Sequence, residues 1–283
     1  MNYLVHCITT SDSYPYADKG IVYTRIKSRK HDFRATIRLL KPDVIVNAAG
    51  SPSVGFSAAN PDEDYYLNFE LTKQILKGYR TLTTETRFIQ LSSAAVYGNP
   101  SELPIDETSE SAPISNYGNT KLKSELELER LFAQGFPVFN LRLFSVYGPG
   151  LKKQLFWDIF EKYLLNSKRV TLFGTGKESR DFIYIDDVIC TIINCFDCPT
   201  ADFLHYNVCA GKEITIRQAA ACFLDEISAD CEIIFNNEVK KGDPINWLGL
   251  NKRLGNLGVQ NFTEFEDGIK EYAKWILKEN KLE

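Results

Sequence analysis

The fold is decided by the stretch from Arg87 to Phe144, in which an apolar run, a long helical pattern and a second apolar run follow one another. These segments are RFIQLS at 87–92, SNYGNTKLKSELELERLFA at 115–133 and PVFNLRLF at 137–144. Short, nearly continuous apolar runs are typical of strands that are buried on both faces, and such strands are parallel when a helix connects them. The stretch therefore predicts one strand–helix–strand unit of a parallel sheet.

The same alternation continues on both sides of this stretch. Further strands are predicted at 3–9, 43–48, 170–172 and 207–208, and further helices at 32–40, 62–79, 216–227 and 264–278. Alternating units of this kind predict an α/β fold with a doubly wound parallel sheet. Because no linker or repeat divides the chain, we expect a sheet domain over 1–150 with a smaller C-terminal lobe over 151–283 folded against it.

Composition and charge narrow the class of protein. The 283 residues are 44% hydrophobic and 25% charged, and the formal net charge of −4 does not favour nucleic acid as a partner. No apolar stretch is long enough to span a membrane, and residues 1–10 do not read as a signal peptide. Seven mostly scattered cysteines are typical of a reducing compartment. We therefore expect a cytoplasmic protein with no membrane or nucleic acid partner.

A tyrosine and a lysine lie four residues apart near the start of the helix predicted at 115–133. The segment Tyr117-Gly-Asn-Thr-Lys121 places both side chains on one helical face, so the ammonium can lie close to the phenol. A free tyrosine, with a pKa of about 10, is a poor acid or base near neutrality. Lowering that pKa by ~3 units takes roughly 4 kcal/mol, to which a nearby positive charge contributes. This spacing alone also occurs on ordinary solvated helices.

A serine at the end of the preceding strand strengthens the case. The run LSSAAVYG at 91–98 leaves the strand with hydroxyls and small residues. The active crevice of an open α/β sheet lies beyond the carboxyl ends of its strands, so Ser93 is predicted to bind the oxygen whose proton Tyr117 exchanges. The alternative for Ser93 is a turn serine that bonds its own backbone.

Taken together, these segments resemble the extended short-chain dehydrogenase/reductase family of NAD(P)-dependent nucleotide-sugar epimerases and dehydratases. The resemblance covers nearly the whole chain, in the family's order. The matching motifs are VNAAG at 46–50, NP at 60–61 with Asn68 and Thr72, PIDE at 104–107, RLFSVYGPG at 142–150, GTG at 174–176, RDFIYIDDV at 180–188, YNV at 206–208 and LG at 257–258. The resemblance implies a Rossmann-like fold with a substrate-binding C-terminal lobe, NAD or NADP as cofactor, and a nucleotide-diphosphate sugar as substrate.

The resemblance also implies roles for single residues. Ser93, Tyr117 and Lys121 become the catalytic residues, with Tyr117 exchanging a proton while the nicotinamide ring exchanges hydride. Ser93 also holds the substrate oxygen, and Lys121 lowers the pKa of Tyr117. The cofactor-binding positions are Thr9, Ala48, Ala49, Gly50, Tyr117 and Lys121.

Two further positions are implied to bind the substrate. Arg180 is expected to bind the diphosphate, since a guanidinium can do so bidentately. The alternative for Arg180 is a surface ion pair with Asp181 or Asp186. Ser145 lies in the strand before the loop that lines the same site, at a position where many members of the family have asparagine, so one substrate hydrogen bond is left open.

Two departures from the family narrow the reaction. Sugar 4,6-dehydratases carry an Asp-Glu pair where this chain has Ala94-Ala95, so no acid for water elimination is present and an epimerase, with C4 as the expected carbon, is favoured. NAD-preferring members end their second strand with an aspartate, where this chain has Thr9, Thr10 and Ser11. That feature favours NADP, and with it an NADPH-dependent reductase of nucleotide-4-keto sugars. The epimerase is the leading prediction.

The largest departure lies at the N-terminus. A dinucleotide-binding fold opens with a strand, a Gly-x-x-Gly-x-x-Gly turn and a helix that holds the pyrophosphate. No glycine precedes Gly20, and the strand predicted at 3–9 matches the family's second strand. The resemblance therefore implies that one βα unit, roughly 25–30 residues, is missing. A third hypothesis follows, a non-catalytic relative that binds a sugar nucleotide without turnover.

Metal binding and assembly complete the expectations. Cys195-x-x-Cys198, His205 and Cys209 have spacings that a zinc site can use, but Cys209 falls where the family has a small residue, and no metal is predicted. The family commonly dimerises through its two long helices, here 62–79 and 115–133. By resemblance we expect a homodimer.

Overall fold

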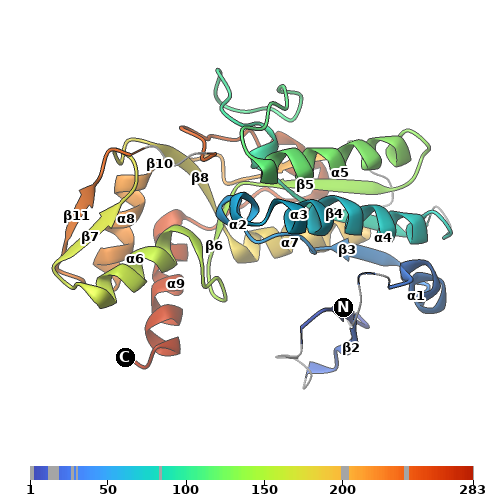
Figure 1. Ribbon diagram of the computed structural model, residues 1–283, viewed down its shortest axis with the longest axis horizontal. Coiled ribbons are helices and arrows are strands. Elements are labelled where there is room, and N and C mark those ends of the chain that lie inside the picture. Colours follow the sequence, from blue (N-terminus) through green and yellow to red (C-terminus); the bar gives the residue numbers. More distant parts are fainter. Residues whose placement is uncertain are drawn as a thin grey trace. The chain divides into compact units, whose positions relative to one another are not determined.

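The computed structural model describes residues 3–11, 19–26, 29, 31–82, 85–198, 204–238 and 242–282 (Figure 1). The chain forms two compact units. Unit 1 comprises Met1–Lys41 and Gln74–Leu82, and unit 2 comprises Pro42–Lys73 and Thr83–Glu283. Every predicted site residue except Thr9 belongs to unit 2. The sequence-based division at residue 150 stays a prediction.

Unit 1 contains a pair of short parallel strands and a capped helix. Strand β1 (His6–Thr9) is shorter than the strand predicted at 3–9, and it pairs with β2 (Val22–Arg25). Helix α1 (Phe33–Leu40) is capped by Asp32, whose carboxylate accepts the Ala35 N–H at 3.1 Å. It packs closely on the end of α4 (Leu71–Tyr79), because a Cβ on Gly78 would lie 2.7 Å from a methyl carbon of Ile37.

Unit 2 is built on a parallel sheet with the strand order β3-β4-β5-β9. The strands are β3 (Val44–Asn47), β4 (Arg87–Ser93), β5 (Val138–Leu143) and β9 (His205–Val208). Helix α5 (Asn116–Phe132) connects β4 to β5, which pair in parallel. The strand–helix–strand unit predicted from residues 87–144 is confirmed. Strand β9 comes from beyond residue 150, so the C-terminal part of the sequence contributes to the main sheet.

The two faces of this sheet differ in polarity, because side chains alternate along each strand. Leu141 packs with Val188 of α7 (Ile185–Asp197) in an apolar cluster, whereas the next residue, Arg142, binds Glu125 of α5. We define the apolar face by Ile89, Leu91, Phe139, Leu141, Tyr206 and Val208, and the polar face by Gln90, Ser92, Asn140, Arg142, His205 and Asn207. Because helices pack on both faces, the predicted doubly wound α/β fold is confirmed.

The connection from β3 to β4 is a run of consecutive helical segments, the first three of which contact α5. These are α2 (Val54–Ala59), α3 (Pro61–Tyr65), the π-helical turn η2 (Tyr66–Glu70) and α4. The helix predicted at 62–79 is therefore interrupted by a turn with wider, i→i+5 bonding. That turn carries Asn68, which is buried and faces α5.

The remainder of unit 2 forms two smaller sheets and an aromatic core. One sheet has the order β10-β8-β6, and the other pairs β11 with β7. The strands are β6 (Ser145–Tyr147), β7 (Arg169–Leu172), β8 (Ser179–Tyr184), β10 (Glu213–Thr215) and β11 (Glu232–Phe235). Helices α6 (Gln154–Leu165), α8 (Ile216–Glu226) and α9 (Phe265–Glu279) lie beside these strands (Figure 1). Phe156 and Phe223 are buried in the core that they share.

Two short 3₁₀ helices complete the described elements that bear on the site. They are η3 (Ala94–Val96), directly after β4, and η4 (Lys252–Leu257), which contributes to the apolar cluster under the main sheet. Among the described residues, no helix has both the length and the apolar content needed to cross a bilayer.

Candidate active site

Three of the predicted residues meet where β4 ends. Ser93 is the last residue of β4, and its hydroxyl accepts a hydrogen bond from the Ala95 N–H at 3.2 Å. The Ser93 side chain also lies close enough to the Tyr117 phenol to lower its pKa. Lys121, one turn further along α5, donates from Nζ to the Leu91 carbonyl at 3.0 Å, and this Nζ lies 5.7 Å from the centroid of the Tyr117 ring. The bond to the Ala95 N–H is the one that the turn-serine alternative expects, and the predicted binding of a substrate oxygen by Ser93 stays a prediction.

The first turn of α5 lies against η3 because the local sequence allows a close approach. Ser115 caps the helix by accepting the Gly118 N–H at 3.1 Å. A Cβ on Gly118 would collide with the carbonyl oxygen of Ala95, so a larger residue would push the helix away from the sheet. The glycine between Tyr117 and Lys121 therefore helps to bring both side chains to the end of β4.

The loop after β3 lies against the same lysine. An added Cβ on Gly50 would lie 3.0 Å from Lys121 Nζ and 2.7 Å from Asn68 Oδ1, so only glycine fits without displacing them. Ala48 and Ala49 precede it with small side chains, of which Ala48 is exposed. A backbone free of large side chains beside a buried ammonium fits the nicotinamide and ribose end of a dinucleotide. Thr9, the remaining predicted cofactor residue, ends β1 in unit 1.

Burial shifts the pKa values of both titratable residues. Burial raises the pKa of Tyr117 to about 12, while the Ser93 side chain lowers it and Asp64 raises it by smaller amounts. The expected lowering of this pKa by Lys121 is therefore not observed, because the effect of burial is larger. Burial lowers the pKa of Lys121 to about 8, against the opposing effects of Asp64 and Glu125. At neutral pH both groups hold their protons, so the site presents a phenol that can donate and an ammonium that can stabilise its anion.

The two other predicted substrate residues, Ser145 and Arg180, lie on the smaller β10-β8-β6 sheet. Ser145 begins β6 and Arg180 lies in β8. Arg180 Nη1 donates to the carbonyls of Ser179 and Ile245 at 2.7 and 3.0 Å, and its guanidinium lies 5.7 Å from the centroid of the Trp247 ring. Trp247 packs in the same cluster as η3, with Tyr117 against it, which connects Arg180 to the end of β4.

Asp181 does not pair with Arg180, contrary to the alternative considered from the sequence. Its carboxylate instead accepts the backbone N–H groups of Ala210, Gly211 and Gly249, at 2.8, 3.0 and 3.1 Å respectively. Asp181 therefore ties β8 to the two segments beside it and helps to hold Arg180 in place. This carboxylate has a structural task rather than an ion-pairing one.

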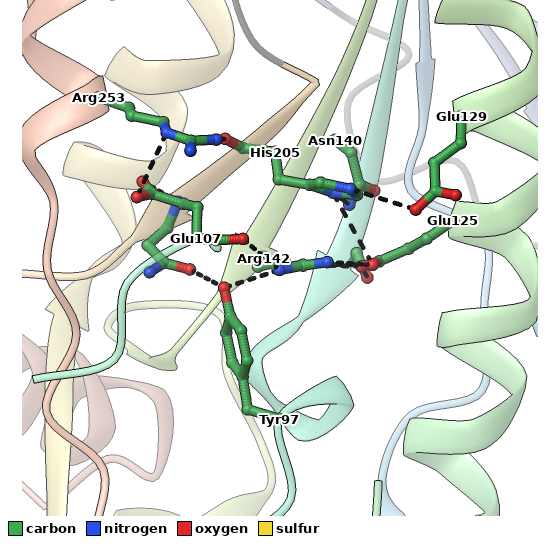
Figure 2. Close-up of polar contacts among 10 residues, drawn as sticks. Tyr97, Glu107, Glu125, Glu129, Asn140, Arg142, His205 and Arg253 are labelled. Atoms are coloured by element: carbon green, nitrogen blue, oxygen red, sulfur yellow. Dashed lines mark hydrogen bonds and ion pairs between the residues drawn. The ribbon is translucent and has the colours of Figure 1, made fainter. Parts of the chain in front are cut away.

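A charged network under α5 holds the helix on the polar face of the sheet (Figure 2). Glu125 accepts Ser92 Oγ at 2.5 Å and Arg142 Nη2 at 2.7 Å, and Arg142 Nη1 donates to the Tyr97 hydroxyl at 2.8 Å. Tyr117, Lys121 and Glu125 are four residues apart, so they lie on one face of α5. This face lies against the end of β4, Leu91 to Ser93. The network therefore fixes the register between the helix and the strand that carries Ser93.

The side chains considered for zinc lie in separate surroundings. Cys195 belongs to the apolar cluster under the main sheet and Cys209 to the cluster around Trp247, while His205 bonds Asn140 at 2.9 Å. Across the described ranges, no group of three or more histidine, cysteine or acidic side chains is placed to hold a metal ion.

The structure adds side chains that the sequence analysis left out of the site. They are Asn68, which the sequence offers only as part of a family motif, and Asp64, Ser51 and Trp247, which no sequence motif singles out. Asp64, Asn68 and Thr72 follow one another at four-residue spacing, which is a polar stripe on an otherwise ordinary helix. That spacing is the sequence signal that would have directed attention to the buried face of this segment.

Comparison with known proteins identifies the family. Residues 2–209 match the model of the NAD dependent epimerase/dehydratase family. The chain belongs to this family. It is 29% identical over 231 residues to the "uncharacterized UDP-glucose epimerase YtcB" of Bacillus subtilis (strain 168), with 80% of this chain and 72% of the relative covered. It is 27% identical over 259 residues to a "putative UDP-glucose 4-epimerase" of Methanocaldococcus jannaschii, with 89% and 83% covered.

Solved structures of family members have the same fold. The UDP-glucose 4-epimerase of Thermotoga maritima, solved with UDP-glucose, superposes with a TM-score of 0.86 at 23% identity, covering 98% of this chain and 92% of that one. The UDP-N-acetylglucosamine 4-epimerase of Methanobrevibacter ruminantium M1 gives 0.84 at 22% identity, with 97% and 91% covered. Other structural neighbours were solved with NAD or with NADPH. At these identities the likeness shows the Rossmann-type fold.

Proposed function

We propose that this chain is an NAD(P)-dependent nucleotide-sugar epimerase that moves hydride at a sugar carbon, C4, with Tyr117 as the acid/base. The observation that carries the proposal is the assembly of Ser93, Tyr117 and Lys121 at the end of β4, next to Gly50. Membership of the family and the relatives that are named epimerases support it. The Ala94-Ala95 pair, which offers no acid for elimination, favours epimerisation over dehydration.

The residues divide the chemistry among them. Ser93 would hold the oxygen on the reacting carbon, and Tyr117, acting as the anion that the Lys121 ammonium stabilises, would take the hydroxyl proton as hydride leaves that carbon. Tyr117 then returns the proton to the ketone oxygen when hydride comes back to the opposite face. Lys121, charged at neutral pH, stabilises the Tyr117 anion and binds the ribose next to the nicotinamide. The bound nicotinamide supplies the hydride acceptor and donor.

The remaining predicted residues would bind and orient the two ligands. Ala48, Ala49 and Gly50 would contact the cofactor through their backbone, and Thr9 stays a predicted cofactor-binding position. Arg180 would bind the diphosphate of the sugar nucleotide, and Ser145 would donate to the same ligand. The carbonyls that hold one guanidinium nitrogen of Arg180 leave its other nitrogens to bind phosphate oxygens.

Cofactor content tests this proposal. The 283-residue chain would be purified and denatured, and the released material would be assayed for NAD and NADP. If neither is released, NADPH would be titrated into the folded protein. Retained NAD, with interconversion of UDP-glucose, UDP-N-acetylglucosamine or UDP-glucuronic acid and its C4 epimer, would support the epimerase. Exchangeable NADPH with reduction of a 4-keto sugar would support the reductase, in line with Thr9, Thr10 and Ser11. Sugar-nucleotide binding without either cofactor would show a non-catalytic relative.

The variant Gly50→Ala tests whether the cofactor binds beside Lys121. In Gly50→Ala the new methyl group would displace Lys121 Nζ or Asn68 Oδ1, so the affinity for the cofactor should fall while sugar-nucleotide affinity is retained. Gly135→Ala is the control for a glycine-to-alanine change without a steric clash, because an added Cβ there would meet nothing within 4 Å. Its φ of 82° adds a mild backbone strain. Equal cofactor affinity in wild type and Gly50→Ala would contradict the placement of the cofactor.

We also propose a cytoplasmic homodimer. All seven cysteines have free thiols, which suits a reducing compartment. Tyr65 of α3 and Leu126 of α5 are 38% and 46% exposed on adjacent helices, and such apolar side chains suit contact with a second copy. Light scattering on the purified chain measures the mass, and Leu126→Glu should convert a dimer to monomers.

A further inference from the structure

Asp64 is a buried carboxylate that the proposed chemistry does not use. It lies in α3 with no exposed surface. Glu125, the comparable buried acid on α5, is neutralised by Arg142 at 2.7 Å. Asp64 takes part in none of the ion pairs found within 4.0 Å among the described residues. A buried charge without a close partner costs several kcal/mol, so its presence calls for a reason.

The carboxylate is held by three donors from three segments. One oxygen accepts the Ser51 hydroxyl and Asn68 Nδ2, the latter at 2.8 Å, and the other accepts the Thr120 hydroxyl at 2.6 Å. Ser51 directly follows Gly50 in the loop after β3, and Thr120 directly precedes Lys121 in α5. Asp64 is thus fixed between the two parts of the chain that meet at Lys121.

The π-helical turn completes this arrangement. It carries Asn68, whose amide nitrogen also bonds Ser51 Oγ and Thr120 Oγ1, at 2.9 and 3.1 Å. Asn68 Oδ1 and Lys121 Nζ both lie close to the Cβ position of Gly50, at 2.7 and 3.0 Å from it. The Lys121 ammonium therefore lies close to Asn68, the residue that bonds Asp64.

The electrostatics of Lys121 agree with this geometry. The groups that act on its charge are the surrounding apolar burial, Asp64 from α3 and Glu125 from its own helix, and Tyr117 presents its neutral ring. Of the two acids, Asp64 has the larger effect in holding the pKa of Lys121 up. The charge of Glu125 is already shared with Arg142, which leaves Asp64 as the acid that is free to act on Lys121.

We propose that Asp64 is a positioning residue that acts through Lys121, its buried charge keeping the Lys121 ammonium protonated in a site that would otherwise favour the neutral amine. The electrostatic coupling between Asp64 and Lys121 exists in the folded chain whether or not the chain is catalytic. Its meaning for catalysis rests on the proposed function, because the Lys121 charge stabilises the Tyr117 anion. The hydrogen bonds to Ser51 and Thr120 would hold the acid in place rather than replace its charge.

The titration of Lys121 tests the coupling directly. The chain would be labelled with lysine carrying ¹³C at Cε, and the Lys121 resonance would be assigned by its loss in Lys121→Met. The midpoint is expected at a pH of about 8 in the wild type. In Asp64→Asn it should fall by about one pH unit or more, the effect of removing a nearby opposite charge. If Asp64→Asn does not fold, Asp64→Ser removes the same charge and carries the same expectation.

Matched variants separate the charge from the packing. Ser51→Ala and Thr120→Val each remove one donor but leave the carboxylate, so the Lys121 midpoint should stay at its wild-type value. An unmoved midpoint in Asp64→Asn, or an equal fall in Ser51→Ala, would overturn the proposal. The titration needs neither cofactor nor substrate, so it remains informative if the proposed function fails. If the chain is active, Asp64→Asn should move the alkaline limb of kcat to lower pH with little change in KM.

Discussion

The polar and apolar faces of the main sheet are built from alternate residues of the same strands, yet they have different requirements. On the apolar face, Leu141 and its neighbours pack with α7 and η4, where volume and shape are what matters. On the polar face, Arg142 and its neighbours form hydrogen bonds and ion pairs that need specific partners. The proposed active site lies at the end of the polar face. Burial alone thus stabilises one face, whereas matched partners stabilise the other and also position the chemistry.

The largest effect is expected from the phenol at the end of the polar face. Tyr117→Phe should lower kcat by about 10²–10⁴-fold, the contribution of a positioned acid/base, while sugar-nucleotide affinity stays near the wild-type value. Tyr97→Phe is the matched control, because its hydroxyl bonds Arg142 and Asn207 but not the Ser93 side chain. The control should lose about 1–3 kcal/mol of stability and keep its turnover. Turnover in Tyr117→Phe equal to that of the control would contradict the assignment.

The next effect concerns the buried ion pair under α5. Glu125→Leu leaves Arg142 buried without its partner and should lower the free energy of unfolding by about 3–5 kcal/mol. The double variant Glu125→Leu/Arg142→Met removes both charges and should lose clearly less, since an apolar pair resembles the opposite face. Urea unfolding of the wild type, both single variants and the double variant measures the coupling. If the losses in the two single variants add up to the loss in the double variant, Glu125 and Arg142 are not coupled and the polar face does not depend on matched partners.

The third effect is a pH dependence that arises from His205 on the polar face. Burial, with a further effect of Arg142, lowers the pKa of His205 to about 4, from an ordinary value of 6.5. Between these values the unfolded chain binds more protons, so stability falls as the pH drops from 6.5 to 4. The loss at pH 4 should be about 3 kcal/mol.

His205→Gln isolates this contribution. Glutamine keeps a group that can bond Asn140 but does not titrate, so the variant should lose about 3 kcal/mol less than the wild type between pH 6.5 and 4. Asp181, whose pKa burial raises to about 7, contributes a slope of the opposite sign in both proteins and cancels in the difference. Parallel stability curves for the two proteins would assign the pH dependence to other groups.

The sequence was sufficient to predict the unit over residues 87–144 and the meeting of Ser93, Tyr117 and Lys121. Helical spacing fixes which side chains share a face, and parallel strands end at one edge, so local patterns decide these contacts. The sequence did not reveal the π-helical turn at Asn68, because its pattern is that of an ordinary helix. It also missed Asp64 and Trp247, whose environment is set by residues far away in the chain, such as Thr120 and Arg180. Such contacts depend on tertiary packing.

The smallest effect is expected on the apolar face, and the adjacent residue provides its contrast. Leu141→Met conserves volume in a cluster without hydrogen-bonding requirements and should cost less than about 1.5 kcal/mol. Arg142→Lys is as conservative in charge, but lysine cannot form the paired contacts to Glu125 and also reach the Tyr97 hydroxyl, so it should cost more. Urea unfolding compares the two on one strand. Equal losses would mean that the polar face tolerates substitution as the apolar face does, and that the register of α5 does not depend on this network.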